Sequence, residues 1–247
     1  MPRFFVDASL FAEDTVTLSG DTHRHISLSL RMAVGDTLTL SDGEGLEADG
    51  RILAMTADET TVALGERRTG EGELPVSVHL YQGNPKGDKS ELIVQKATEL
   101  GASAVTFFES SRTVAHVVPA RADKQRTRLS RIAAEAAGQC GRARIPDVFL
   151  PLSFDAALAE AKESCELLLF CYEAERDASL SRRLARAKEE GVKSIAVFVG
   201  PEGGFSESEA ARAVEAGAVA VTLGRRILRC ETAPLYAISC IGATFEE

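Results

Sequence analysis

The sequence of 247 residues predicts an α/β protein with two domains, and three observations lead to this prediction. The first 70 residues consist of strand-length runs between Gly and Asp turns, with no sustained helical periodicity. After Pro75 strands and helices alternate, which is typical of a mostly parallel sheet flanked by helices. The polar segment 69–75, rich in Gly and Glu, separates the two patterns. We therefore expect one domain over residues 1–72 and a second over residues 73–247.

The N-terminal domain is expected to consist of short strands between turns, because no helical period persists along it. The expected strands cover residues 15–20, 23–31, 36–45, 46–56 and 59–68. Strands this short, joined by turns, predict a small β-barrel or sandwich.

The second domain is expected to contain strands and helices in alternation. The expected strands cover residues 76–83, 103–110, 166–173, 194–200 and 218–224. The expected helices cover residues 88–100, 119–139, 153–163, 179–191, 206–217 and 232–244. Ser206, followed three residues later by Glu209, predicts a capping box at the start of one helix.

The composition narrows the class of protein. No apolar run approaches the roughly 20 residues that cross a membrane, and the opening MPRFFVDASLFAEDT lacks the apolar core of a signal peptide. A cytoplasmic protein without membrane association is the expectation. The five cysteines show no spacing typical of a metal site, so we expect reduced thiols and no bound metal.

The charge is distributed unevenly along an acidic chain with a formal net charge of −9. Residues 1–73 hold 6 lysines and arginines against 14 acidic residues, whereas residues 112–144 hold eight cations and only Asp123 and Glu135 as acids. Such a basic stretch indicates either a nucleic-acid contact or a solvated helix face.

Three turns carry the candidate chemistry, because each follows a predicted buried strand and ligands bind beyond the carboxyl ends of such strands. Residues 198–205 place three glycines within five positions, which allows a ligand to approach the backbone closely. Residues 223–232 hold three arginines and a glutamate, and residues 83–89 hold two lysines. Taken singly, each is also compatible with a tight turn, surface charge or a polar loop.

Together, these turns lie in motifs that resemble one family. KGDKSELIVQKATELG, RIAAEAAGQCGRARIP, VGPEGGFSESE and LGRRILRCETA occur in this order, after the opening MPRFFV. The chain resembles the 16S rRNA (uracil-N3)-methyltransferases of the RsmE family, within the SPOUT superfamily, over almost its whole length. It departs from the family at Ala233-Pro234-Leu235-Tyr236, where an Ala-rich run is expected, although Pro234 is tolerated in the first turn of a helix.

The resemblance implies a fold, a cofactor and partners. It implies an N-terminal PUA-like β-barrel for RNA and a SPOUT-type C-terminal domain with a deep trefoil knot and a mostly parallel sheet. It also implies a cytoplasmic homodimer that uses S-adenosyl-L-methionine without a metal and acts on 16S rRNA within the small ribosomal subunit or its precursor. The cofactor-binding residues implied are Val199, Gly200, Pro201, Gly203, Leu223, Gly224, Ile227, Leu228 and Cys230.

The reaction implied by the resemblance requires the uracil N3–H to lose its proton. If N3 ionises roughly two pH units above neutrality, deprotonation costs about 3 kcal/mol. Arg229 is the candidate that stabilises the developing anion, and Glu231 or Glu202 is the candidate that accepts the proton. The candidate RNA-binding residues are Arg3, Arg24, Arg31, Lys86, Arg112, Arg126, Arg128, Arg131, Arg142 and Arg144.

Two alternatives remain open from the residues alone. One is a non-catalytic PUA-like RNA-binding factor for ribosome assembly, and the other is an α/β enzyme that acts on a small nucleotide. Binding of S-adenosylmethionine would distinguish the methyltransferase from the first, and strong activity on a free nucleoside would favour the second.

Overall fold

The computed structural model describes residues 1–114 and 116–246. The chain forms two compact units. The first comprises Met1–Glu73 together with Ala137–Ile145, and the second comprises Leu74–Ala136 and Pro146–Glu247. Each unit has its own sheet and its own buried core.

The first unit is built on a five-stranded sheet. Its spatial order is β1 (Arg3–Phe5), β3 (Thr37–Ser41), β4 (Leu46–Met55), β5 (Glu59–Thr69) and β2 (Thr15–Ser19). β1 pairs with β3 in parallel, and the other pairs are antiparallel. A short 3-10 helix, η1 (Ala8–Ala12), follows β1. In β2 the apolar residues Val16 and Leu18 face the core, and the polar residues on either side of them face solvent, which is the alternation expected of a strand.

One expectation for this unit is wrong, and one strand was not predicted. Residues 23–31 are not a strand, because the chain there forms α1 (Gly20–Arg24) and then a turn of π-helix, η2 (His25–Ser29). Ile26, Leu28 and Leu30 have the period of a strand, but only Ile26 is buried, whereas Leu28 is 70% exposed and Leu30 is 43% exposed. Strand β1 escaped the sequence analysis because three residues are too few to show a period.

The second unit contains a six-stranded sheet in which every pair of strands is parallel, which confirms the expected α/β organisation. Its order is β11 (Val219–Val221), β9 (Leu167–Cys171), β10 (Ser194–Val199), β6 (Ser77–Gly83), β7 (Ala104–Glu109) and β8 (Asp147–Ser153). The sequence analysis missed β8. This strand lies at the edge of the sheet and contains Pro151, a residue that is tolerated in edge strands but weakens the strand pattern.

All six expected helices are present, with ends that differ by a few residues from the predicted ones. They are α2 (Lys89–Glu99), α3 (Pro119–Cys140), α4 (Phe154–Ser164), α5 (Leu180–Glu189), α6 (Glu207–Glu215) and α7 (Thr232–Phe245). The predicted capping box is confirmed, since Ser206 and Glu209 exchange their hydrogen bonds at the start of α6. No helix within the described ranges is both long and apolar enough to cross a membrane.

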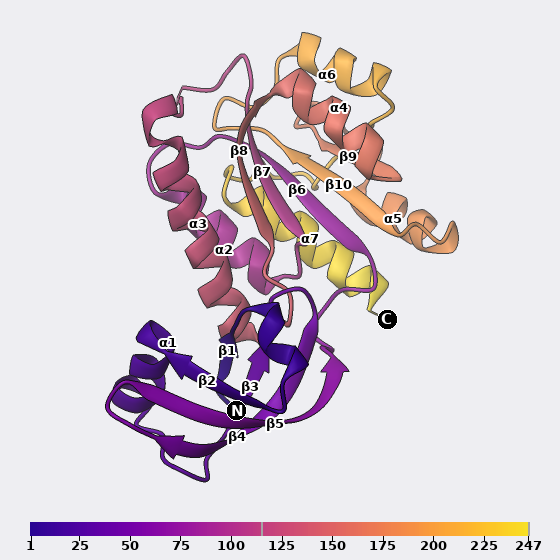
Figure 1. The fold of residues 1–247 in the computed structure, drawn as a ribbon. Helices are drawn as coiled ribbons and strands as arrows, with labels where there is room; N and C mark the ends of the chain where they lie inside the picture. The colour runs from indigo at the N-terminus through magenta and orange to yellow at the C-terminus, as the bar shows by residue number, and fades with distance from the viewer. Residues whose placement is uncertain (115, 247) are drawn as a thin grey trace. The chain divides into compact units, whose positions relative to one another are not determined.

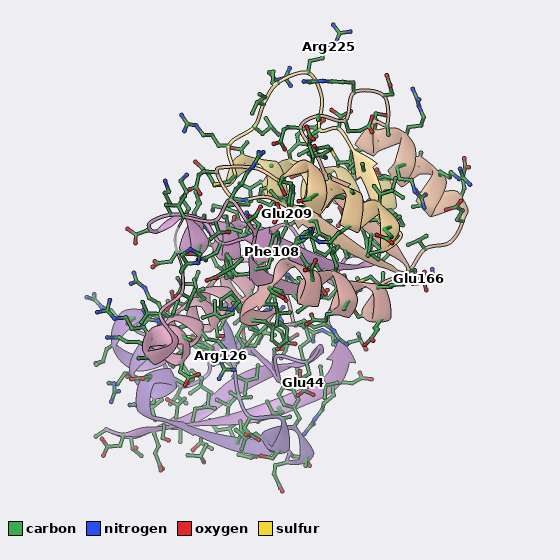
Figure 2. The ribbon with its side chains drawn as sticks, turned by 90° about the horizontal axis from the view of Figure 1, so that it is seen from above. Glu44, Phe108, Arg126, Glu166, Glu209 and Arg225 are labelled. Atoms are coloured by element: carbon green, nitrogen blue, oxygen red, sulfur yellow. The ribbon has the colours of Figure 1, made fainter. Side chains whose placement is uncertain are left out.

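The two faces of the parallel sheet are covered by different helices (Figure 1). α7 packs against α2 and α5 and lies over β6 and β10. On the other face α4 and α6 enclose an aromatic cluster, and Figure 2 shows one of its members, Phe108, within the sheet. Phe205 belongs to this cluster, with its ring centroid 4.2 Å from that of Phe170. Because Phe205 directly follows the glycine-rich turn after β10, its burial fixes the position of that turn.

Candidate functional site

A cavity of about 450 Å³ opens in the second unit, where β9, β10 and β11 end. Its volume lies within the range of small-molecule sites. The residues that line it come from the segments after these three strands and from the start of α7. They are Cys171, Tyr172, Glu173, Arg176, Val199, Gly200, Pro201, Glu202, Gly203, Gly204, Thr222, Leu223, Gly224, Arg226, Ile227, Leu228, Arg229, Cys230 and Ala233.

The first wall is the GPEGG turn, residues 200–204. The N–H of Gly204 donates to the carbonyl oxygen of Pro201 across 2.9 Å, and Gly204 has a φ of +64°. A side chain on Gly204 would meet the carboxylate of Glu173, which also lines the cavity, and the positive φ disfavours any residue other than glycine there. The glycines of this turn therefore leave their backbone accessible to a ligand.

The second wall is the 222–231 loop, which joins β11 to α7. Its turn begins at Thr222, whose hydroxyl lies 3.2 Å from the carbonyl oxygen of Gly224, and Gly224 has a φ of +109°. Ile227 is 84% exposed, whereas Cys230 is buried at the end of the loop. Figure 2 shows Arg225 at the outer end of the loop, with its side chain pointing away from the ribbon.

Lys89 links the two walls. It is the first residue of α2, and its Nζ lies 2.9 Å from Oε1 of Glu202 and 3.2 Å from Oε2 of Glu231. The same Nζ lies 3.6 Å from Sγ of Cys230, and that thiol donates to Glu231 across 3.2 Å. The backbone N–H of Lys86 also donates to Glu202, across 3.1 Å. One ammonium thus joins the start of α2, the GPEGG turn and the 222–231 loop.

These contacts shift the pKa values of the groups involved. Burial raises the pKa of Glu202, but the hydrogen bonds from Lys89 and from the backbone N–H of Lys86 outweigh this effect and lower it to about 2. The pKa of Glu231 is also lowered, since hydrogen bonds from its own N–H, from Cys230 and from Lys89 exceed the effect of burial. Burial and the neighbouring Glu231 raise the pKa of the Cys230 thiol to about 12. At neutral pH the cluster therefore holds two carboxylates, one ammonium and a neutral thiol.

The loop after β7 supports the GPEGG turn from a further direction. Ser111 donates to Glu209 from its N–H across 2.7 Å and from its hydroxyl across 2.9 Å. Burial raises the pKa of Glu209, but these bonds and those from Ser206 lower it overall, so Glu209 stays ionised inside the protein. Arg112 donates from Nη1 to the carbonyl oxygen of Gly203 across 3.1 Å. The turn is therefore fixed by both side-chain and backbone contacts.

All of the residues expected to bind the cofactor line this one cavity. Among the expected catalytic residues, Arg229 and Glu202 also line it, and Glu231 bonds to Lys89 and Cys230 beside it. The sequence analysis missed two sets of residues. Glu173 and Arg176 follow β9, so the rule that placed ligands at strand ends could have identified them. Lys89 lay within the third candidate turn without being singled out.

The basic residues expected to bind RNA fall into several environments. On α3, Arg128 pairs with Glu91 across 2.7 Å and Arg131 pairs with Glu135 across 3.4 Å. Arg126 is exposed on the same helix (Figure 2). Lys86 and Arg112 lie near the GPEGG turn, and Arg144 is exposed in the segment 137–145. Arg128 and Arg131 also border an open hollow on α3 together with Lys124 and Thr127.

The expectation that Arg142 contacts RNA is wrong. Its side chain is 2% exposed, and its Nη2 bonds to Oε2 of Glu73 across 2.6 Å. A guanidinium enclosed in this way offers no surface to a phosphate. In the same unit Arg3 pairs with the buried Glu47, Arg24 pairs with Asp21, and Arg31 is exposed with a φ of 53°. In the first unit, Arg24, Arg31 and Arg144 are therefore the exposed residues among those expected to bind RNA.

No group of three or more His, Cys, Asp or Glu side chains within residues 1–114 and 116–246 has the arrangement of a metal site.

Comparison with known proteins identifies the family. Residues 72–242 match a family described as "RNA methyltransferase domain". The chain is 35% identical to the "Ribosomal RNA small subunit methyltransferase E" of Bacillus subtilis, over 98% of this chain and 96% of that protein. It is 32% identical to the protein of the same name from Mycobacterium bovis, over 97% of this chain and 90% of that protein.

Comparison with a solved structure gives the same family. The fold matches the ribosomal RNA small subunit methyltransferase E of Neisseria gonorrhoeae bound to S-adenosyl methionine, with a TM-score of 0.82 and 31% identity. The match covers 98% of this chain and 97% of that one. Two of the motifs that suggested the family, VGPEGGFSESE and LGRRILRCETA, supply most of the residues that line the cavity, and the chain belongs to the ribosomal RNA small subunit methyltransferase E family.

Proposed function

We propose that this protein transfers a methyl group from S-adenosyl-L-methionine to N3 of a uridine in 16S rRNA. The observation that carries the proposal is the single cavity built from the GPEGG turn and the 222–231 loop, which contains every residue expected to bind the cofactor. Membership of a family of ribosomal RNA small subunit methyltransferases supports the substrate class. The activity is expected in the cytoplasm, where ribosomal subunits are assembled.

The cavity fits the proposed cofactor chemically. Val199, Leu223 and Leu228 offer apolar surface to a flat base, and the glycines of both walls leave backbone N–H and C=O groups accessible. Glu173 and Arg176 supply one negative and one positive side chain for the polar parts of the molecule. When bound, S-adenosyl-L-methionine supplies an activated methyl group, and the chain's own residues hold the uracil in line with it.

Arg229 is proposed to stabilise the uracil anion. It lies on the cavity rim, between Leu228 and the buried Cys230, and its guanidinium is exposed where RNA would approach. A fixed cation beside O2 or O4 lowers the cost of removing the N3 proton. This contribution acts on the transition state, so it is expected in kcat.

The two carboxylates are proposed to have different roles. With a pKa of about 2, Glu202 is a poor proton acceptor, since an efficient base has a pKa near the working pH. Glu202 is therefore assigned to holding Lys89. Glu231, whose pKa is also lowered but without reaching a value as low as that of Glu202, remains the candidate that accepts the N3 proton, because it directly follows the cavity-lining residues Arg229 and Cys230.

Basic side chains of each unit are proposed to contact the RNA. Arg126, Arg128 and Arg131 on α3 would contact phosphates, together with Lys86 and Arg112 near the cavity and Arg144 in segment 137–145. Arg24 and Arg31 would add contacts from the N-terminal domain. Phosphate contacts fix the position of the RNA, while the cavity selects the base.

The domain architecture is proposed from the family. Residues 1–72 are proposed to be a PUA-like β-barrel that binds RNA. Residues 73–247 are proposed to be a SPOUT domain with a deep trefoil knot, and the protein is proposed to act as a homodimer. The separate sheets of the two units and the match of residues 72–242 to an RNA methyltransferase domain support the division into two domains.

The proposal is tested with small ribosomal subunits from a strain that lacks the gene. The purified protein and S-adenosyl-L-methionine are added, and the nucleosides of the 16S rRNA are analysed by mass spectrometry. Appearance of one N3-methyluridine per subunit supports the proposal. RNA binding without methyl transfer would instead indicate a non-catalytic assembly factor.

A further inference from the structure

We propose that Lys89 is a positioning residue that clamps the cofactor cavity, by holding the GPEGG turn and the 222–231 loop together through Glu202 and Glu231. The proposal rests on the proposed function only for the identity of the cofactor. The clamp itself follows from the contacts of one ammonium group.

The contacts join parts of the chain that are far apart in sequence. Nζ of Lys89 lies 2.9 Å from Glu202 and 3.2 Å from Glu231, so the two carboxylate oxygens are no more than about 6.1 Å apart. The side chains are partly enclosed, with Lys89 30% exposed. Each wall of the cavity thus contributes one carboxylate, and α2 contributes the cation between them.

The charges explain why the cation is needed. Two carboxylates at this distance disfavour each other's ionised form unless an opposite charge lies between them. The groups that face them are Lys89 at the start of α2, the backbone N–H of Lys86 in the turn before α2, and the thiol of Cys230 from the loop. Cys230 stays neutral, because burial and Glu231 raise its pKa to about 12. Among these groups Lys89 alone carries a positive charge between the walls.

The clamp is expected to act locally. An isolated surface ion pair contributes little to global stability. The turn and the loop, however, contain glycines with positive φ and no regular secondary structure, so their relative position depends on contacts such as this one. Loss of the clamp should therefore change cofactor affinity much more than the melting temperature.

The experiment compares Lys89→Met, Lys89→Arg and the matched control Lys96→Met by calorimetric titration with S-adenosylmethionine from pH 5 to pH 9. Lys96 lies on the same helix and pairs with Glu99, also of α2, across 2.7 Å. Lys89→Met is expected to weaken binding by about tenfold or more at pH 8. The loss should shrink toward pH 5, because protonation of one carboxylate relieves the repulsion. Lys96→Met and Lys89→Arg should bind nearly as the unmodified protein does.

A double variant distinguishes the clamp from a general structural role. Lys89→Met combined with Glu202→Gln removes one of the opposed charges, so it should recover part of the lost affinity. The proposal is overturned if Lys89→Met binds as the unmodified protein does. It is also overturned if the loss is the same at every pH and the double variant recovers nothing. If the unmodified protein itself binds no S-adenosylmethionine, the proposed function fails instead.

Discussion

Arg112 reaches back to the GPEGG turn, where its Nη1 donates to the carbonyl oxygen of Gly203 across 3.1 Å. A Cβ built on Gly203 would lie 2.9 Å from Cβ of Arg112 and 3.1 Å from its carbonyl oxygen. The loop after β7 is therefore packed against the turn after β10 at a point where only a glycine fits. Arg112 thus supports the cavity wall, whatever contact it makes with RNA.

Gly203→Val is expected to weaken binding of S-adenosylmethionine by about tenfold or more, because the new side chain must displace the Arg112 loop or the turn. Calorimetry measures the affinity. Gly138→Ala serves as the control, since a Cβ there makes only an ordinary contact with Phe5, at 3.6 Å. Equal affinities for all three proteins would show that the turn accommodates the valine.

Arg142→Ala is expected to destabilise the protein by about 3 to 5 kcal/mol. The substitution removes the buried guanidinium and leaves the largely enclosed carboxylate of Glu73 without its partner cation. Chemical denaturation measures the free energy of unfolding. The double variant Arg142→Ala with Glu73→Ala should be more stable than Arg142→Ala alone. A stable Arg142→Ala protein that had lost only RNA affinity would restore Arg142 to the RNA-binding set.

Arg229→Ala and Arg128→Ala are expected to change different kinetic constants, kcat and KM for RNA respectively. Arg229→Ala should lower kcat at saturating RNA by about 10²-fold if it stabilises the anionic base. Arg128→Ala should raise KM for RNA and reduce the salt slope of binding by about one, although its pair with Glu91 limits its contribution. Steady-state kinetics at several salt concentrations separates the two, with unchanged thermal transitions as the control. If Arg229→Ala changes only KM, its catalytic assignment is wrong.

His79 is expected to make stability fall as the pH is lowered below neutrality. Burial lowers the pKa of His79 to about 4 from an ordinary value of 6.5, and its Nε2 lies 2.8 Å from the hydroxyl of Thr106. Between these two pKa values the unfolded state binds a proton that the folded state does not. The full contribution is therefore present above pH 6.5 and declines as the pH falls toward 4, by at most roughly 3 kcal/mol.

The measurement compares the free energies of unfolding at pH 7 and pH 4.5 for the unmodified protein and for His79→Gln. The variant should lose less stability between these pH values than the unmodified protein does. The same pH dependence in both proteins would mean that His79 is not responsible.

The fold of the second unit was predictable because buried parallel strands and amphipathic helices leave strong patterns. Thus α5 and the capping box at Ser206 appear where the sequence indicates. The prediction of secondary structure failed where a short apolar pattern did not distinguish a strand from a helix or a loop. Residues 23–31 alternate like a strand, yet tertiary contacts bury Ile26 and leave Leu28 in solvent. The edge strand β8 was hidden by Pro151.

The glycines of the candidate site and its charged residues Glu202 and Arg229 were predictable from sequence, but the ion pairs that its charged side chains form were not. A glycine-rich turn after a buried strand has a local cause, so the GPEGG turn was recognisable from sequence. The partners of Lys89 depend on which loops the topology brings together, and no spacing along the chain encodes this. For the same reason, Arg142 looked like a member of a basic surface until its contact with Glu73 was known.

The first unit is discontinuous in sequence, and this affects how it can form during synthesis. The hydroxyl of Ser41 donates to the carbonyl oxygen of Ala143 across 2.9 Å, and the N–H of Ile145 donates to Gly43 across 2.9 Å. Both contacts must wait until residues 74–136 have been translated, which takes on the order of 5 s. During that interval all five strands of the N-terminal sheet are already present, but the hydroxyl of Ser41 and the carbonyl oxygen of Gly43 lack these partners. A protein cut after residue 73 would leave both groups without them permanently.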